Sequence, residues 1–228
     1  LDLSFTRNDT LDPRITFTRA SSATRTNSQG LIEVVSSNTV RFDYDPVTLA
    51  PKGLLIEEQR TNLVTYSEQM DHAAWQKLLG GTGLAPVVTP NATIAPDGAL
   101  TADRIVFDKG VGTTSTDQSI LQSTVPTSVT GQPASAFMWL KSATASNYVM
   151  RLDFSGQSGE GAGFLSLITV TPTWQRFEIR IASAIDTTRR IHLRLRGTQS
   201  TDNFADIYAW GAQQENGAFA TSYIPTVV

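Results

Sequence analysis

Apolar and polar residues alternate with a period of two along most of the chain. The alternation is unbroken in residues 190–197, which read RIHLRLRG, and residues 174–181 and 148–154 follow the same rule. Three shorter segments share the pattern: 103–108, 136–141 and 206–212. Because successive side chains of a strand point to opposite faces, this period is typical of strands with one buried face. Turn residues separate the segments, and the pattern predicts an all-β, antiparallel sandwich or barrel.

The N-terminal region differs in texture and reads as two β-hairpins. The expected strand pairs are 23–27 with 31–35, across a glycine turn, and 40–46 with 53–58. Two hairpins rarely fold alone, so this appendage is expected to pack on the main domain, on another subunit or on upstream sequence. The predicted domains are a β-hairpin appendage over residues 1–60 and a β domain over residues 61–228.

Other local signals are few. The only helical signal is a turn over residues 67–75, which Ser67 is placed to cap. The chain begins at Leu1 rather than methionine, which predicts a fragment or a processed product. No run of about 18 apolar residues and no basic region followed by an apolar one is present, so we expect no membrane insertion and no signal peptide.

The composition excludes several classes of site. The chain has no cysteine, and therefore no disulfide, thiolate zinc site or cysteine nucleophile. Charged residues make up 17%, while thirty threonines and twenty serines supply polarity through hydroxyl groups. The net charge of -3 argues against binding of nucleic acid through its phosphates.

Catalytic signatures are missing from the sequence. It has no Walker A loop, HExxH, GxSxG or histidine pair with metal-ligand spacing, and its two histidines, His72 and His192, have no supporting triad motif. We therefore predict a protein that is not an enzyme. Glycoside hydrolysis needs only two suitably spaced carboxyl groups, so a polysaccharide-degrading enzyme stays an alternative.

Strand parity gathers charged residues on outer faces. If Ile191 and its apolar neighbours face the core, His192 and Arg194 face outward together. The same rule places Arg151 and Asp153 outside. Guanidinium groups hold diol or carboxylate oxygens well, so this face suits hydroxyl-rich or anionic ligands. The alternative is an ordinary solvated face.

Two aromatic residues are candidates for stacking on a sugar ring. Lys141 shares parity with Trp139, and because a lysine does not point into a core, Trp139 is expected to face outward. Phe137 has the same parity and favours burial, so a bulge or inversion of this strand is the alternative. Tyr148 is the second stacking candidate. The remaining large aromatics considered are expected to anchor the core: Trp75 and Trp174.

Several motifs resemble a module common in bacteriophage and prophage-like structural proteins. They are residues 17–24 (FTRASSAT), 41–46 (RFDYDP), 53–63 (GLLIEEQRTNL), 210–217 (WGAQQENG) and 220–226 (ATSYIPT). Such modules occur in tail fibres, tail spikes and the head spikes of gene transfer agents. The middle of the chain, with residues 137–141 and 173–177, is similar to jelly-roll carbohydrate-binding modules. The resemblance implies an antiparallel jelly-roll β-sandwich with a short N-terminal β-hairpin appendage.

The resemblance also implies a function and a setting. The expected function is non-catalytic recognition of host cell-surface polysaccharide, and the expected carbohydrate-binding residues are Trp139, Tyr148, Arg151, Asp153, His192 and Arg194. The expected setting is the surface of a virion or phage-like particle, made in the bacterial cytoplasm and released by lysis. Its partners there are other particle proteins and further copies of the chain in a homo-oligomer. The alternatives are an assembly or adaptor domain without glycan binding, and a capsule-degrading glycosidase or lyase.

A cofactor is not required by this interpretation. Many relatives of carbohydrate-binding modules hold a structural Ca²⁺, so a calcium ion is an open alternative. Glu68, Asp71 and Asp206 lie near the corresponding places, but they do not define a ligand set, and no metal site is assigned.

Overall fold

The protein is described by a computed structural model that covers residues 5, 10–123, 131–155, 165–182, 189–197 and 199–227. Within these residues the chain forms fourteen strands and no helix, and hence no helix long and apolar enough to cross a membrane. Two compact units are present. Unit 1 comprises residues 1–59, 96–98 and 221–224, and unit 2 comprises 60–95, 99–220 and 225–228.

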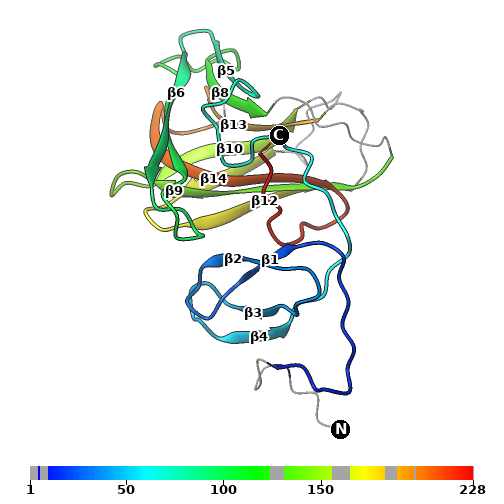
Figure 1. The fold of residues 1–228 in the computed structure, drawn as a ribbon. Helices are drawn as coiled ribbons and strands as arrows, with labels where there is room; N and C mark the ends of the chain where they lie inside the picture. The colour runs from blue at the N-terminus through cyan, green and yellow to red at the C-terminus, as the bar shows by residue number, and fades with distance from the viewer. Residues whose placement is uncertain are drawn as a thin grey trace. The chain divides into compact units, whose positions relative to one another are not determined.

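Unit 2 is an antiparallel jelly-roll β-sandwich of two five-stranded sheets (Figure 1). The first sheet has the order β11 (Leu165–Val170), β10 (Tyr148–Ser155), β13 (Arg190–Arg196), β8 (Gln118–Ser123) and β5 (Trp75–Gly80). The second sheet has the order β12 (Gln175–Ile181), β9 (Ala134–Ser142), β14 (Phe204–Asn216), β7 (Ala102–Asp108) and β6 (Leu84–Thr93). The predicted all-β fold class is confirmed.

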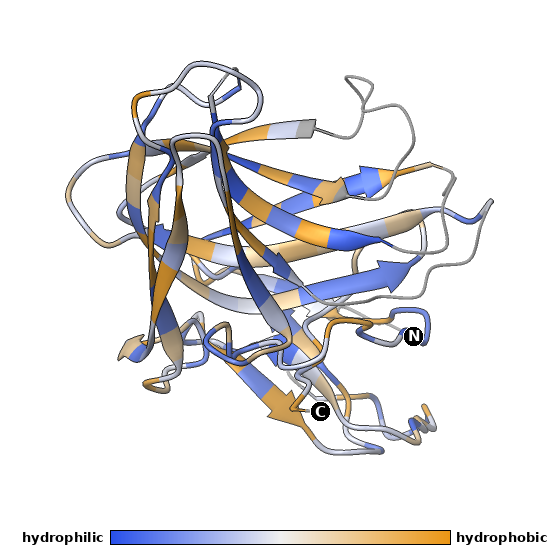
Figure 2. Ribbon diagram, turned by 90° about the horizontal axis from the view of Figure 1, so that it is seen from above, coloured by the Kyte–Doolittle hydropathy of each residue, from blue (hydrophilic) through white to orange (hydrophobic). Residues whose placement is uncertain are grey.

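The alternation of the sequence determines which faces form the core. Leu152 of β10 pairs with Leu193 of β13, and both are fully buried between the sheets. Ile207 of β14 pairs with Ile105 of β7 in the facing sheet, and both join the same core. Hydrophobic and hydrophilic bands therefore alternate along the strands (Figure 2). Trp75 is also part of this core, as predicted.

Residues 67–75 form successive turns rather than the predicted helical turn. Three backbone hydrogen bonds of 3.0–3.2 Å, donated by Gln69, His72 and Trp75, each close a turn on the residue three positions earlier. The Ser67 hydroxyl does not cap this segment. It donates to the Thr226 carbonyl at 3.2 Å and accepts from the Thr226 amide at 2.9 Å. The prediction was wrong because a segment distant in sequence uses the capping group.

Unit 1 contains the two hairpins expected from the sequence. Their strands are β1 (Ala23–Thr26) with β2 (Ile32–Val35), and β3 (Phe42–Tyr44) with β4 (Pro51–Leu54). Gly30 turns the first hairpin with a φ of 79°. A Cβ at this position would lie 2.7 Å from the Pro46 carbonyl oxygen, so only glycine fits the turn.

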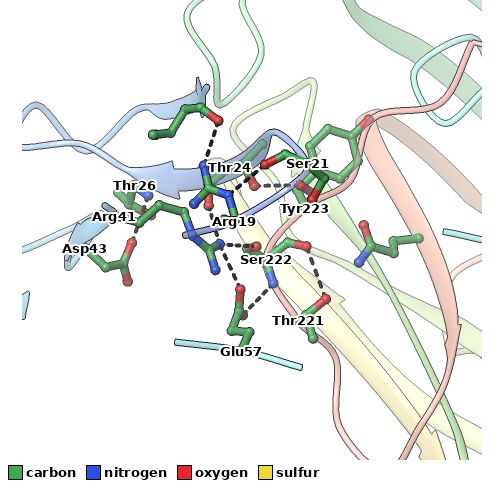
Figure 3. Close-up of polar contacts among 12 residues, drawn as sticks. Arg19, Ser21, Thr24, Thr26, Arg41, Asp43, Glu57, Thr221, Ser222 and Tyr223 are labelled. Atoms are coloured by element: carbon green, nitrogen blue, oxygen red, sulfur yellow. Dashed lines mark hydrogen bonds and ion pairs between the residues drawn. The ribbon is translucent and has the colours of Figure 1, made fainter. Parts of the chain in front are cut away.

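A buried arginine links both hairpins of unit 1 to the C-terminal segment (Figure 3). Arg41 Nη1 lies 2.9 Å from a Glu57 carboxylate oxygen and donates to the Thr24 carbonyl and the Ser222 hydroxyl, both at 2.8 Å. Glu57 also accepts the Ser222 amide at 2.7 Å, and the Thr24 hydroxyl donates to the Tyr223 carbonyl at 2.5 Å. Residues 221–224 therefore complete unit 1.

Candidate functional site

Four of the predicted site residues meet on the outer face of the first sheet. The strand register places Arg151 opposite Arg194 and Asp153 opposite His192. Asp153 lies at the centre of the group, with one carboxylate oxygen 2.9 Å from both Nε and Nη2 of Arg194. The same oxygen is 3.5 Å from Arg151 Nε, and the other is 3.4 Å from His192 Nδ1.

Glutamines on the neighbouring strands extend this network. His192 Nε2 is hydrogen-bonded to Gln122 Oε1 on β8, and Gln122 Nε2 donates to Gln76 Oε1 on β5 at 2.6 Å. We use the name polar cluster for five of these residues: Arg151, Asp153, His192, Arg194 and Gln122. The polar cluster thus connects three adjacent strands through side chains as well as through the backbone.

The polar cluster is buried, which corrects the prediction of an open binding face. The exposed fractions are 0% for Asp153, 1% for Arg151, 4% for Arg194 and 8% for His192. Burial lowers the pKa of His192, and the neighbouring Asp153 opposes this effect. Alternation placed these side chains away from the core, but it carried no information on whether they reach solvent.

The two predicted stacking residues lie on different sheets. Tyr148 has the parity of Met150, packs against the hydrophobic core, and its hydroxyl is hydrogen-bonded to Thr144 Oγ1 at 3.0 Å. This placement corrects its prediction as a stacking residue, because its ring contributes to the core. Trp139 lies on the second sheet, where Met138 and Leu140 are in the core and Trp139 is half-buried on the opposite face. The six predicted residues therefore do not form one site.

A row of alternating aromatic and cationic side chains crosses the outer face of the second sheet. Lys141 of β9 pairs with Tyr208 of β14, which pairs with Arg104 of β7. Trp174 directly precedes Gln175, the partner of Leu140, and so lies beside Lys141 at the start of β12. We use the name aromatic row for these four residues: Trp174, Lys141, Tyr208 and Arg104.

Contacts within the aromatic row orient its side chains. Lys141 Nζ lies 5.9 Å from the centroid of the Trp174 ring and 5.8 Å from that of Tyr208, within the range of cation–π attraction. Trp174 Nε1 donates to the Ile94 carbonyl at 3.2 Å, which holds the indole in place. Trp174, Lys141 and Tyr208 are half-buried and Arg104 is exposed, so solvent reaches all four side chains.

A second layer of rings supports this face. Trp139 contacts Trp210 edge to face with centroids 5.4 Å apart, and Phe137 likewise at 5.1 Å. The guanidinium carbon of Arg176 lies 3.7 Å from the centroid of Phe137, whose ring is fully buried. Phe137 is therefore buried on the outer face, beneath an arginine, and the strand needs no inversion to bury it. Trp210 Nε1 donates to Thr101 Oγ1 at 3.1 Å.

Carboxylates near the aromatic row are held by arginines. Asp206 accepts from Arg104 Nε and Nη2 at 2.8 and 2.5 Å, and Glu178 accepts from Arg180 Nε at 2.6 Å. Asp206 does not meet Glu68 and Asp71, since no three histidine or acidic side chains of the described residues form a group that could hold a metal ion.

The sequence contained part of the signal for this site. The parity of Lys141 placed Trp139 outward, and Tyr208 shares the parity of Asp206, but Tyr208 and Arg104 were not singled out. The prediction that Trp174 anchors the core is wrong: it is half-buried and lies outside the core cluster. It stands just before its strand, so no alternation fixes its direction.

Comparisons with known proteins give only distant likenesses. No family model matches the sequence, and no curated protein does. Among solved structures, the enzymatically active domain of tailspike protein 4 of bacteriophage CBA120 shares 15% identity and a TM-score of 0.46 over 69% of this chain. The chain spans only 21% of that tailspike domain.

Carbohydrate-binding modules are similar at the same level. The family 11 module of a cellulosomal cellulase of Clostridium thermocellum has 13% identity and a TM-score of 0.46, over 73% of this chain and 99% of that one. A family 22 xylan-binding domain of Paenibacillus barcinonensis has 14% identity and a TM-score of 0.45, over 72% of this chain and 100% of that one. Likenesses this distant say nothing of a ligand, so the site must be argued from this chain's own residues.

Proposed function

We propose that this chain is a non-catalytic glycan-binding module and that the aromatic row is its binding surface. One observation carries the proposal: two solvent-accessible rings, Trp174 and Tyr208, lie on either side of Lys141 on a single sheet face. Neighbouring strands are about 4.8 Å apart, so the four residues extend over about 14 Å, a length suited to a short oligosaccharide.

The chemistry of the row matches that of a sugar. A sugar ring has an apolar face of C–H groups, which packs on an aromatic ring, and a rim of hydroxyl groups that accept hydrogen bonds. Lys141 supplies an ammonium donor between the two rings, and Arg104 supplies guanidinium donors beside Tyr208. An open row of this kind buries little surface, so we expect weak binding by each copy and stronger binding by an oligomer.

We propose that the ligand is host cell-surface polysaccharide and that the chain acts as a homo-oligomeric receptor-binding part of a phage or phage-like particle. The motifs RFDYDP at residues 41–46 and WGAQQENG at residues 210–217 support this setting by their resemblance to such modules. A chain that assembles with other particle proteins would present several aromatic rows to one cell surface.

Absence of catalysis is also part of the proposal. Two carboxylates on this sheet face, those of Asp206 and Glu178, each accept hydrogen bonds from an arginine, which engages the groups that glycoside hydrolysis would require. We expect the purified chain to release no reducing ends from host polysaccharide. We also expect glycan binding to be unchanged by EDTA, because stacking and hydrogen bonding by the row involve no metal ligand.

A second candidate function, assembly, is favoured by a feature of unit 1. Its small hairpins leave three aliphatic side chains well exposed: Val34 (65%), Val47 (85%) and Ile56 (77%). Exposed apolar groups on a small unit are suited to contact with another protein surface. The two functions are compatible, and the mass of the chain in solution, with these three side chains replaced by serine, tests assembly separately from binding.

The test of glycan binding is a titration with host polysaccharide and its oligosaccharides. We expect Trp174→Ala and Tyr208→Ala each to weaken binding about tenfold, which corresponds to about 1.4 kcal/mol. Leu167→Ala is the matched control, because Leu167 is an exposed side chain (62%) opposite Arg151 on the first sheet. Unchanged binding by both aromatic variants would reject this site, and a lack of binding by the wild type across a glycan array would reject the function.

A further inference from the structure

Lys141 has an unusual set of neighbours for a lysine on a sheet face. Its ammonium group is within 6 Å of the centroids of two aromatic rings. Among the described residues, no carboxylate lies within ion-pair distance of it. The neighbouring arginines differ, since Arg104 is paired with Asp206 and Arg176 has Glu178 at 3.8 Å. In the part of the chain that the structure describes, the contacts of the Lys141 ammonium group are therefore with ring faces and not with a carboxylate.

The surroundings of Lys141 carry a local excess of positive charge. On the aromatic row and the two cross-strand rows beside it, the charged side chains are Arg104, Lys141, Arg176 and Asp206. Asp206 is the only carboxylate among these four side chains, and both of its oxygens accept hydrogen bonds from Arg104. The whole chain has a formal net charge of -3, so this basic area stands out from the average of the protein.

Resting on the proposed function, we propose that the ligand is an acidic glycan, with one anionic substituent that pairs with Lys141. The sugars on either side of the acidic residue stack on Trp174 and Tyr208. A carboxylate accepts charge-assisted hydrogen bonds from the ammonium group, and these are stronger than the bonds that a neutral hydroxyl accepts. The flanking rings also exclude part of the water around Lys141, which reduces the screening of this pair.

A single-stranded nucleic acid is the competing polyanion, because bases also stack on aromatic rings. Two observations favour a glycan. Nucleic acid carries a phosphate at every residue, whereas the row offers one cation without a carboxylate partner. The net charge of -3 also repels a long polyanion, while a glycan with isolated acidic groups meets only the local basic area.

The test compares acidic polysaccharides with their own carboxyl-reduced forms. Reduction converts each uronic acid to the neutral hexose and leaves the linkages unchanged, so the two polymers differ only in charge. Sulfated polysaccharides of the same backbone distinguish a carboxylate from a sulfate. We expect at least one acidic polymer to bind about five- to tenfold more tightly than its neutral form, with the difference shrinking as salt is raised.

Variants at one position assign this difference to Lys141. Lys141→Gln is expected to bind the acidic and neutral polymers equally, and Lys141→Arg is expected to keep most of the preference. Thermal unfolding checks that both variants are folded.

The outcomes separate this inference from the proposed function. Equal binding of the acidic and neutral forms by the wild type overturns the inference and leaves glycan binding intact. Tighter binding of a single-stranded oligonucleotide than of any glycan also overturns it. An acidic preference that persists in Lys141→Gln shows that another cation carries it, which contradicts the assignment to Lys141. No binding to acidic or neutral polymers contradicts the proposed function itself.

Discussion

The two outer faces of the sandwich carry similar residue types but use them differently. On the first sheet, Asp153 is surrounded by Arg151, Arg194 and His192, and all four side chains are buried. On the second sheet, Lys141 is flanked by rings that solvent reaches. On the first face a carboxylate and its cations are buried together, whereas on the second face a cation is accessible to solvent. Charge outside a core is therefore a poor guide to a binding site unless partners and exposure are known.

The largest difference between the faces is expected in stability. Asp153→Ala leaves two buried guanidinium groups without their carboxylate, and we expect a loss of about 3–5 kcal/mol in the free energy of unfolding. Glu178→Ala is the matched control, because it removes an arginine-paired carboxylate from the second sheet face. That pair is much more exposed, so a loss of about 1 kcal/mol or less is expected. Equal losses in urea unfolding would remove the distinction between the faces.

A smaller effect separates stability from binding. Arg194→Met keeps much of the length of the side chain but removes its hydrogen bonds to Asp153. We expect this variant to be less stable than the wild type by about 2 kcal/mol, within the range for hydrogen bonds to charged groups, and to bind glycan unchanged. Tyr208→Ala should show the converse, with nearly unchanged stability and weaker binding. If the folded Arg194→Met variant lost glycan affinity, the polar cluster would have to be part of the binding site.

The smallest predicted effect is a dependence of stability on pH. Burial lowers the pKa of His192. At pH values below the ordinary histidine pKa of about 6.5, the folded state therefore binds fewer protons than the unfolded state. His192 therefore stabilises the fold above this pH, and the contribution is lost as the pH falls toward its lower folded pKa. Urea midpoints at about pH 7.5 and about pH 5 should differ less in His192→Gln than in the wild type.

Another buried group has the opposite sign and must be separated from this effect. Burial raises the pKa of Asp103 to about 6, although its oxygens accept the backbone amides of Met70 and Asn91. The pKa of Asp103 in the folded state exceeds the ordinary value of about 3.9. Its protonation therefore stabilises the fold increasingly as the pH falls from about 6 to about 4. The comparison of His192→Gln with the wild type cancels this contribution. An unchanged pH dependence in the variant would contradict the account of His192.

Strand parity explains how much of the structure the sequence predicts. Alternation identified the sides of the strands correctly, because Leu152 and Leu193 face the core while Asp153 and His192 face away. Parity is a local property of one strand. Whether an outward residue is covered depends on segments that alternation does not locate, and this is why the polar cluster was expected on an open face.

The site itself required cross-strand register. Trp174, Lys141 and Tyr208 come from three segments separated by more than thirty residues each in the sequence, and only the pairing of β12, β9 and β14 aligns them. Tyr148 is the opposite case. It lies two residues before Met150 on the same strand, so alternation alone already placed its side chain on the core side of the sheet. Ser67 is a third example. Its hydroxyl was expected to cap a helical turn, but it accepts a hydrogen bond from the backbone amide of Thr226, which is distant in sequence.

Indole N–H signals in an NMR titration with host oligosaccharide test whether the aromatic row is the glycan-binding surface. The chain has four tryptophans, with Trp174 on the aromatic row, Trp139 beside it and Trp75 in the core. We expect the ligand to shift the Trp174 signal most, to shift that of Trp139 less, and to leave that of Trp75 unchanged. Shifts confined to backbone amides of β10 and β13, with the Trp174 signal unmoved, would contradict it.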